Sequence, residues 1–247
     1  MIETSDSIRR MRSRRSLAAL AAVALWATAC GGSQEQKPKR QAGESAGIQK
    51  AGAYSYATRG YERLSALVAS RHDYPRTSTV TVTLTGCGFT ERWEPRPERS
   101  SEWRFCVDGQ RWRLALLLDY HEFFGQPVQQ RFSCRGPFVP RPTVVSIGFR
   151  WTDRCSGAGS RVTVVYKAVR EQALRVGGTR VETVFVRARA RLRGRIDGLN
   201  SYESWQSRAN GLLVRRNVRS DTAIDTPFGK VRDRERYSLK LRSLTPG

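Results

Sequence analysis

The last third of the chain alternates apolar with polar residues over runs of strand length, and this pattern constrains the fold more than any other feature. Turn signals interrupt it at Gly177-Gly178, Asp197-Gly198, Asn210-Gly211 and Pro227-Phe228-Gly229. The runs between them lie near 161–176, 180–195, 201–208, 212–220 and 230–243. Successive residues of a strand point to opposite faces of a sheet, so each run presents two different faces. The sequence therefore predicts a five-strand antiparallel meander here.

The two faces of this meander differ in charge. In the run 180–195 every second residue is apolar and often small, namely Val184, Val186, Ala188, Ala190 and Leu192. The residues between them are Arg187, Arg189, Arg191 and Arg193. The last run repeats this arrangement, with Leu239 and Leu241 opposite Lys240 and Arg242. Guanidinium groups about 7 Å apart on one strand face form a candidate site for an anionic surface, and a merely solvated face has the same pattern.

Strand character begins well before the meander. Val80, Val82 and Leu84 alternate with threonines, and Asp108-Gly109 is a hairpin signal between two further apolar rows. The stretch 126–142 contains four prolines, which predicts a loop or an edge, and strand character returns over 143–151.

One segment of the expected domain has a different period. Tyr61, Leu64, Leu67 and Val68 lie at helical spacing, which predicts one short helix over 61–71. A long sheet with one apolar face and a single helix to cover it should curl around that helix. We therefore expect an all-β domain, mainly an antiparallel meander, that forms a curved open or half barrel wrapped on one short helix.

The N-terminus has the order of a secretory signal. Five arginines precede an apolar run over 17–29, and Cys30 follows small residues at its end. The segment Ala27-Thr28-Ala29-Cys30 resembles the lipobox of bacterial lipoproteins, which implies acylation of Cys30 after cleavage; a signal peptide with an unrelated cysteine is the alternative. We expect a signal peptide over 1–29, a flexible tether over 30–50 and a single β-rich domain over 51–247. The expected location is the extracytoplasmic side of the cell membrane, through the lipid anchor.

The other four cysteines are Cys87, Cys106, Cys134 and Cys155. Their spacing lacks the close pairs of structural zinc sites, and an exported protein meets an oxidising compartment. Two disulfides are expected. Four cysteines allow three connectivities, and we favour Cys87 with Cys106 and Cys134 with Cys155 because each closes a short excursion.

The chain from Ile147 to its end resembles a known group of proteins. The residues that carry the resemblance are Gly178 before a long strand, Glu203-Ser204-Trp205, the run 211–215 and the closing run 241–246. They look like secreted actinobacterial lipoproteins of unknown function. More distantly they are similar to lipoprotein carriers and mycobacterial lipid-binding lipoproteins, whose half barrel holds acyl chains. The resemblance implies a fold and no binding residues.

Residue types with catalytic potential come together at one place, where Asp119 and His121 should face the same side of a strand and Glu122 follows. The alternative is a polar strand end, since one histidine without a nucleophile makes no known triad. The sequence has no nucleophile elbow, and Gly229-Lys230 lacks the first glycine of a phosphate-binding loop. We expect no enzyme activity, no cofactor and no metal site.

The formal net charge of +22 favours anionic partners. Nucleic acid is not expected, because an exported protein rarely meets it. Three function classes follow. The first is a lipoprotein that binds a lipid or another apolar molecule inside a cavity lined by the rows of Val184, Ala188 and Leu241. The second is an envelope adhesion or scaffold module that binds anionic polymers or lipid head groups, with a filled core and a continuous basic face. The third is an enzyme.

Overall fold

The computed structural model describes residues 47–65, 69–123, 125–226 and 229–247. The predicted lipidation site Cys30, the predicted signal peptide and most of the predicted tether lie outside these residues. Among the described residues there is no helix with the length and hydropathy needed to span a bilayer.

The described chain folds into one antiparallel sheet of fourteen strands. The strands are β1 (Gly52–Ser65), β2 (Ala69–Asp73), β3 (Thr77–Thr85), β4 (Gly88–Arg96), β5 (Arg99–Asp108), β6 (Arg111–Phe123), β7 (Gln126–Arg135), β8 (Val139–Pro140), β9 (Arg150–Gly157), β10 (Ser160–Val176), β11 (Thr179–Gly194), β12 (Ile196–Ser207), β13 (Leu213–Thr226) and β14 (Gly229–Leu241). The all-β, antiparallel character and the meander of the last third are confirmed.

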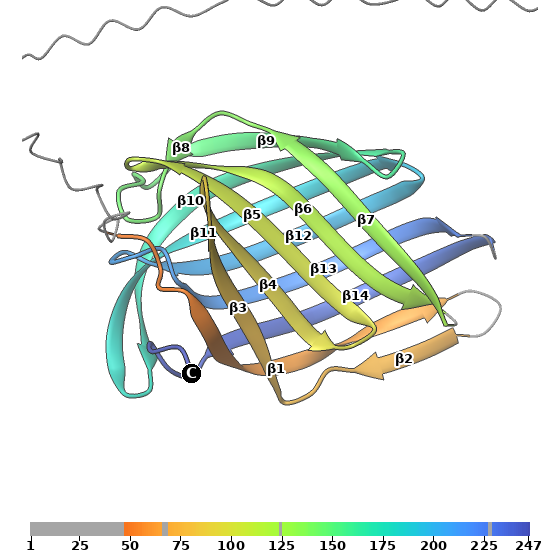
Figure 1. Cartoon of the computed structure of the whole chain (residues 1–247), viewed down its shortest axis with the longest axis horizontal. Helices are drawn as coiled ribbons and strands as arrows, with labels where there is room; N and C mark the ends of the chain where they lie inside the picture. The colour runs from red at the N-terminus through yellow and green to blue at the C-terminus, as the bar shows by residue number, and fades with distance from the viewer. Residues whose placement is uncertain (1–46, 66–68, 124, 227–228) are drawn as a thin grey trace, which may run out of the picture. The chain divides into compact units, whose positions relative to one another are not determined.

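The sheet closes into a barrel, so the expected open or half barrel is wrong. Twelve strands form the ring, because β14 pairs with β1 from Tyr56↔Leu241 to Ser65↔Arg232 (Figure 1). β2 pairs with β1 and β8 pairs with β6 beside the ring. The physical reason for closure is that no helix covers the apolar face among the described residues, so the sheet covers that face with itself.

The helix expected over 61–71 is also wrong. Residues 61–65 continue β1, and β2 begins at Ala69. Glu62 and Leu64 are both buried, whereas Arg63 between them is exposed, which is the alternation of a strand. The sequence hid this alternation because one of the inward residues, Glu62, is an acid, which is usually exposed.

The stretch from 126 to 151 differs from expectation in both of its parts. β7 is a ring strand, with Pro127 near its start opposite Glu122, and the other three prolines come after its last residue, Arg135. A proline near the beginning of a strand removes little of the ladder. The strand expected over 143–151 begins only at Arg150, because Val144 and Val145 donate backbone hydrogen bonds to Arg141 in a turn.

The interior is packed with large side chains. Tyr54, Tyr56 and Trp93 are fully buried, and Trp93 stacks on Tyr237 with ring centroids 4.2 Å apart. The Tyr56 hydroxyl donates a 2.5 Å hydrogen bond to the carbonyl of Leu213 in β13, which is separated from β1 by β14 alone. The apolar rows predicted on β11 and β14 point into this core, and the arginines between them point outward.

Two disulfides join neighbouring strands. Cys87, in the turn after β3, bonds to Cys106 in β5, and Cys134 in β7 bonds to its register partner Cys155 in β9. These are the sequential pairs that the spacing favours.

Gly60 allows β1 and β14 to approach closely. Its φ of 150° is one that residues with side chains rarely adopt, and a Cβ atom there would lie 2.2 Å from the carbonyl oxygen of Arg236. Closure of the ring therefore depends on a glycine at this position.

Candidate functional site

The barrel interior contains a mostly apolar half with a small cavity. The cavity has a volume of about 100 Å³, and its lining includes Trp103, Trp151, Tyr166, Ala188 and the polar pair Asp153 and Arg216. Val184 and Leu241, which were expected to line a cavity with Ala188, lie instead in the packed core clusters. Pockets for drug-sized ligands measure about 300–1,000 Å³, so this space is small by comparison.

The other half of the interior is charged. A second cavity of about 60 Å³ is lined there by Arg99, Asp119, His121, Gln130, Asp233 and Glu235. Arg99 lies within 3.4 Å of Glu235 and 3.3 Å of Asp119, and the Tyr74 hydroxyl donates a short hydrogen bond to Glu235. Glu62 from β1 joins the group through a 3.0 Å contact between its Oε1 and the Nδ1 of His121.

The structure separates the three residues with predicted catalytic potential. Asp119 and His121 both face the interior, as their spacing indicates, but each has its own partner. Asp119 accepts a 2.5 Å hydrogen bond from the Ser101 hydroxyl, and His121 pairs with Glu62. Glu122 is exposed on the outside of β6. The three residues therefore do not converge in one cleft.

Burial raises the pKa of both Glu62 and Asp233, but the groups around Glu62 lower its pKa and the charges around Asp233 raise its pKa further. Burial favours the neutral form of Glu62, but its hydrogen bond to His121 and the charges of His121, Arg96 and Arg99 outweigh burial and lower its pKa to about 2. The pKa of Asp233 is raised well above its usual value by burial and then by the charges of Glu235 and Glu62. Sequence reasoning missed Glu62 and Asp233, because each looks like one more polar residue on an exposed face.

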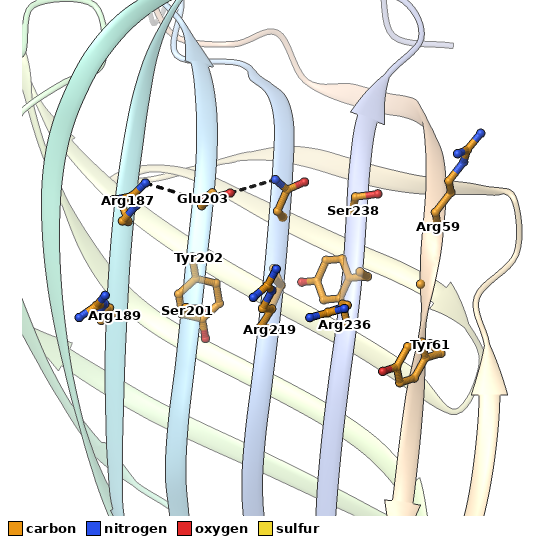
Figure 2. Close-up of a pocket in the computed structure, with 14 residues that line it drawn as sticks. Arg59, Tyr61, Arg187, Arg189, Ser201, Tyr202, Glu203, Arg219, Arg236 and Ser238 are labelled. Atoms are coloured by element: carbon orange, nitrogen blue, oxygen red, sulfur yellow. Dashed lines mark hydrogen bonds and ion pairs between the residues drawn. The ribbon is translucent and has the colours of Figure 1, made fainter.

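The outer face of the barrel carries a larger hollow across β11, β12, β13, β14 and β1, with a volume of about 550 Å³ (Figure 2). Its residues come from two rows that run across the strands. The first row is Arg187, Glu203, Asn217, Ser238 and Arg59, and the second is Arg189, Ser201, Arg219, Arg236 and Tyr61. We call this hollow the arginine groove, after Arg59, Arg187, Arg189, Arg219 and Arg236.

The groove has more positive charge than the protein itself neutralises. Glu203 is the acid that lines it; it lies 3.7 Å from Arg187 and accepts a hydrogen bond from Asn217 (Figure 2). Among the described residues, no ion pair or hydrogen bond is formed by the side chains of Arg59, Arg189, Arg219 or Arg236. Arg219 and Arg236 are direct register partners, and like charges placed opposite one another destabilise a sheet.

Of the four arginines predicted on β11, two line this groove. Arg187 and Arg189 face it. Arg191 and Arg193 lie farther along the strand and line a second outer hollow of about 640 Å³, which Arg161, Arg189 and the exposed Val165 and Leu199 also line. Reading one strand at a time missed Arg59, Arg219 and Arg236. The signal that could have found them is the register between hairpin partners, which brings arginines of separate strands together.

The fold and the groove define a closed antiparallel barrel with a basic outer hollow. No family model matches the chain, and no curated protein matches it. Among solved structures, the hypothetical lipoprotein YmcC from Escherichia coli (K12) is similar at 12% identity and a TM-score of 0.29, over 73% of this chain and 85% of that chain. A likeness at this level carries no argument about function, so the resemblance to actinobacterial lipoproteins stays a prediction.

Proposed function

We propose that the protein is a non-enzymatic, lipid-anchored protein of the extracytoplasmic membrane face, and that its arginine groove binds the anionic head groups of that membrane. Acylated Cys30 would supply the anchor, and the segment before β1 would let the barrel reach the surface. A single acyl chain anchors a protein only marginally, and a basic surface beside it can supply the second signal that stable anchoring takes.

The observation that carries this proposal is the set of four unpaired arginines around one hollow. Repulsion between like charges is normally offset by oppositely charged partners within the protein. On the same outer face, Asp221 is such a partner for Arg232 and Arg234. The groove lacks such partners among the described residues apart from Glu203. An external anion would remove the repulsion between Arg219 and Arg236.

The chemistry of the groove favours phosphate groups. Guanidinium groups present planar donor pairs that match phosphate oxygens, and several arginines at neighbouring sites can share one anion. Basic residues near an anionic bilayer contribute about 1 kcal/mol each. Tyr61 and Ser201, which lie beside the arginines in the second row, add hydroxyl groups to the same surface.

The small interior also supports an outer binding surface. The two cavities measure about 100 and 60 Å³, and the rest of the interior is occupied by aliphatic, aromatic and charged side chains. A filled core with a basic face is the arrangement expected of the second function class.

The proposal is tested with the full chain carrying Cys30→Ser, so that acylation does not contribute to binding. We expect this protein to sediment with vesicles rich in anionic phospholipid at low salt and to be released as salt increases. The triple variant Arg189→Gln/Arg219→Gln/Arg236→Gln should bind about 100-fold more weakly, since about 1 kcal/mol is lost per arginine and about 3 kcal/mol in all.

A matched control removes three arginines from the far side of the ring. Arg131, Arg135 and Arg154 are exposed on β7 and β9, and Arg135 and Arg154 are register partners, like Arg219 and Arg236. Changing these three to Gln lowers the net charge equally but leaves the groove intact. Equal losses of binding in both triple variants would contradict the proposal. Displacement of the vesicles by soluble polyphosphate would show that the groove recognises phosphate rather than the bilayer.

A second candidate function is the binding of a small apolar molecule inside the barrel. It is favoured by the cavity of about 100 Å³ beside the stacked rings of Trp151 and Tyr166, whose centroids lie 4.8 Å apart. Engineered apolar cavities of about 150 Å³ hold a molecule such as benzene, so an acyl chain would need a wider space. Native mass spectrometry of the purified chain tests this candidate, because a retained ligand adds its mass.

A further inference from the structure

Three buried side chains from distant parts of the sequence meet in the charged half of the barrel. Glu62 comes from β1, His121 from β6 and Asp233 from β14, and each exposes 5% or less of its surface. One nitrogen or oxygen atom from each of the three lies within 4.8 Å of the others. These are metal-ligand atom types, and three protein ligands are the usual number at a zinc site that keeps one position open.

Asp233 lacks the partner that a buried carboxylate needs. Its Oδ1 atom is buried and has no hydrogen-bond partner, and none of the ion pairs of the charged half includes it. Arg96 contacts Glu62, and Arg99 is shared between Asp119 and Glu235. An unpaired buried carboxylate costs several kcal/mol, so a cation beside it would be strongly stabilising.

The charge balance of the surroundings points the same way. Around the 60 Å³ cavity and Glu62 lie the acids Glu62, Asp119, Asp233 and Glu235 and the arginines Arg96 and Arg99. The acids outnumber the arginines, and His121 and His72 both lie beside Glu62. A cation bound by the ionised Asp233 and the neutral imidazole of His121 would offset this acidic excess. The cavity is lined by His121 and Asp233 and has room for an ion with a water molecule, whose share of liquid volume is about 30 Å³.

The ligand types select among divalent cations. Mg²⁺ and Ca²⁺ prefer shells made entirely of oxygen, whereas an imidazole nitrogen with two carboxylates suits Zn²⁺ and its first-row neighbours. Ligand bonds of about 2.1 Å in a tetrahedron place the ligand atoms about 3.4 Å apart. The three ligand atoms now lie within 4.8 Å of one another, so side-chain shifts of about 1 Å would bring them to the tetrahedral spacing.

We propose that Glu62, His121 and Asp233 form a buried binding site for a divalent transition-metal cation of the Zn²⁺ type. The ion joins β1 and β14, the two strands that close the ring, to β6 on the other side of the interior. The adjacent cavity of about 60 Å³ has room for a water molecule as the fourth ligand but not for a drug-sized molecule, so the ion would hold the barrel closed as a structural ion.

The test uses the full chain with Cys30→Ser, which removes the thiol that is not in a disulfide, after treatment with a chelator. Titration calorimetry with Zn²⁺ should give one site per chain, and Zn²⁺ should raise the temperature of thermal unfolding by mass action. Mg²⁺ at the same concentration should do neither. Asp233→Asn and His121→Gln should each lower the zinc affinity at least tenfold and abolish the rise in unfolding temperature.

A folding check and a control variant show whether a loss of zinc binding is specific to the proposed ligands. Asp233→Asn replaces an unpartnered buried acid by a neutral group of the same shape, so this variant should fold, and circular dichroism checks that it does. Asp153→Asn changes another buried acid, in the apolar half, and should bind Zn²⁺ like the parent. No zinc binding by the parent would overturn the proposal, and so would unchanged affinity in both Asp233→Asn and His121→Gln.

Discussion

Asp153 is a buried acid whose ionisation should make the stability of the protein depend on pH. Burial raises its pKa from 3.8 to about 6, although the hydrogen bond with Tyr166 lowers it in part. The folded protein therefore holds this proton more tightly than the unfolded chain does between these two values. Stability from this group is present below pH 3.8 and is lost as pH rises to about 6.

The substitution Asp153→Asn tests this sign. The variant keeps a neutral side chain at all pH values, so it should gain about 3 kcal/mol relative to the parent between pH 4 and pH 7. Urea unfolding of both proteins at the two pH values measures the difference. The same comparison for Asp197→Asn, an exposed acid on β12, should give no pH-dependent difference. A parent that gains stability relative to Asp153→Asn as pH rises would show that Asp153 is not buried as an acid.

At the same scale, buried charges are what the sequence predicts least well. Val184 and Ala188 are apolar, so the alternation along β11 correctly predicts that their side chains point inward. Glu62 and Asp233 also point inward, at positions where parity continues, but a charged residue on a strand is usually read as exposed. The burial of Glu62 depends on Arg96 and His121 from distant strands, which one sequence does not display.

Among the structural elements, β1 has the most demanding position, because it closes the ring against β14. Gly60→Ala would place a Cβ atom 2.2 Å from the carbonyl oxygen of Arg236, at a φ of 150°. We expect a loss of at least about 2 kcal/mol in the free energy of unfolding, from strain and from separation of the two strands.

A substitution at a second glycine separates the cost of an unfavourable backbone conformation from the cost of the close contact at Gly60. Gly109 lies in the hairpin turn between β5 and β6 with a φ of 56°, and a Cβ atom there meets nothing within 4 Å. Gly109→Ala should therefore cost only about 1 kcal/mol, the penalty of the backbone conformation alone. Urea unfolding compares the two variants, and equal losses would mean that the contact between β1 and β14 is not tight at Gly60.

The elements of the last third were predictable because their alternation is long and their turns contain glycine. β11 was expected over 180–195 and spans Thr179–Gly194, and β14 was expected over 230–243 and spans Gly229–Leu241. The short segment 61–71 offered only four apolar residues, too few to separate a helical period from a strand with an inward acid. The prolines after Arg135 suggested that the whole stretch 126–142 is irregular, although β7 ends before three of them.

At the scale of the whole barrel, positive charge gathers in one hollow on the outer face. The sequence shows the arginine row of β11, but the groove arises from the register of five strands that extend over more than half of the chain. Closure of the ring places Arg59 of β1 beside β14 and so completes the groove. An open barrel would have left Arg59 on a separate edge, which is why the groove could not be predicted.

The central claim is that the arginine groove is the surface that meets an anionic membrane. The most direct measurement is the rate at which each arginine of the full Cys30→Ser chain reacts with phenylglyoxal, followed by peptide mass spectrometry with and without anionic vesicles at low salt. We predict that Arg189, Arg219 and Arg236 react several-fold more slowly with vesicles present, that high salt restores their rates, and that Arg131, Arg135 and Arg154 are unaffected. Unchanged rates at the groove, or equal protection of both sets, would contradict the account.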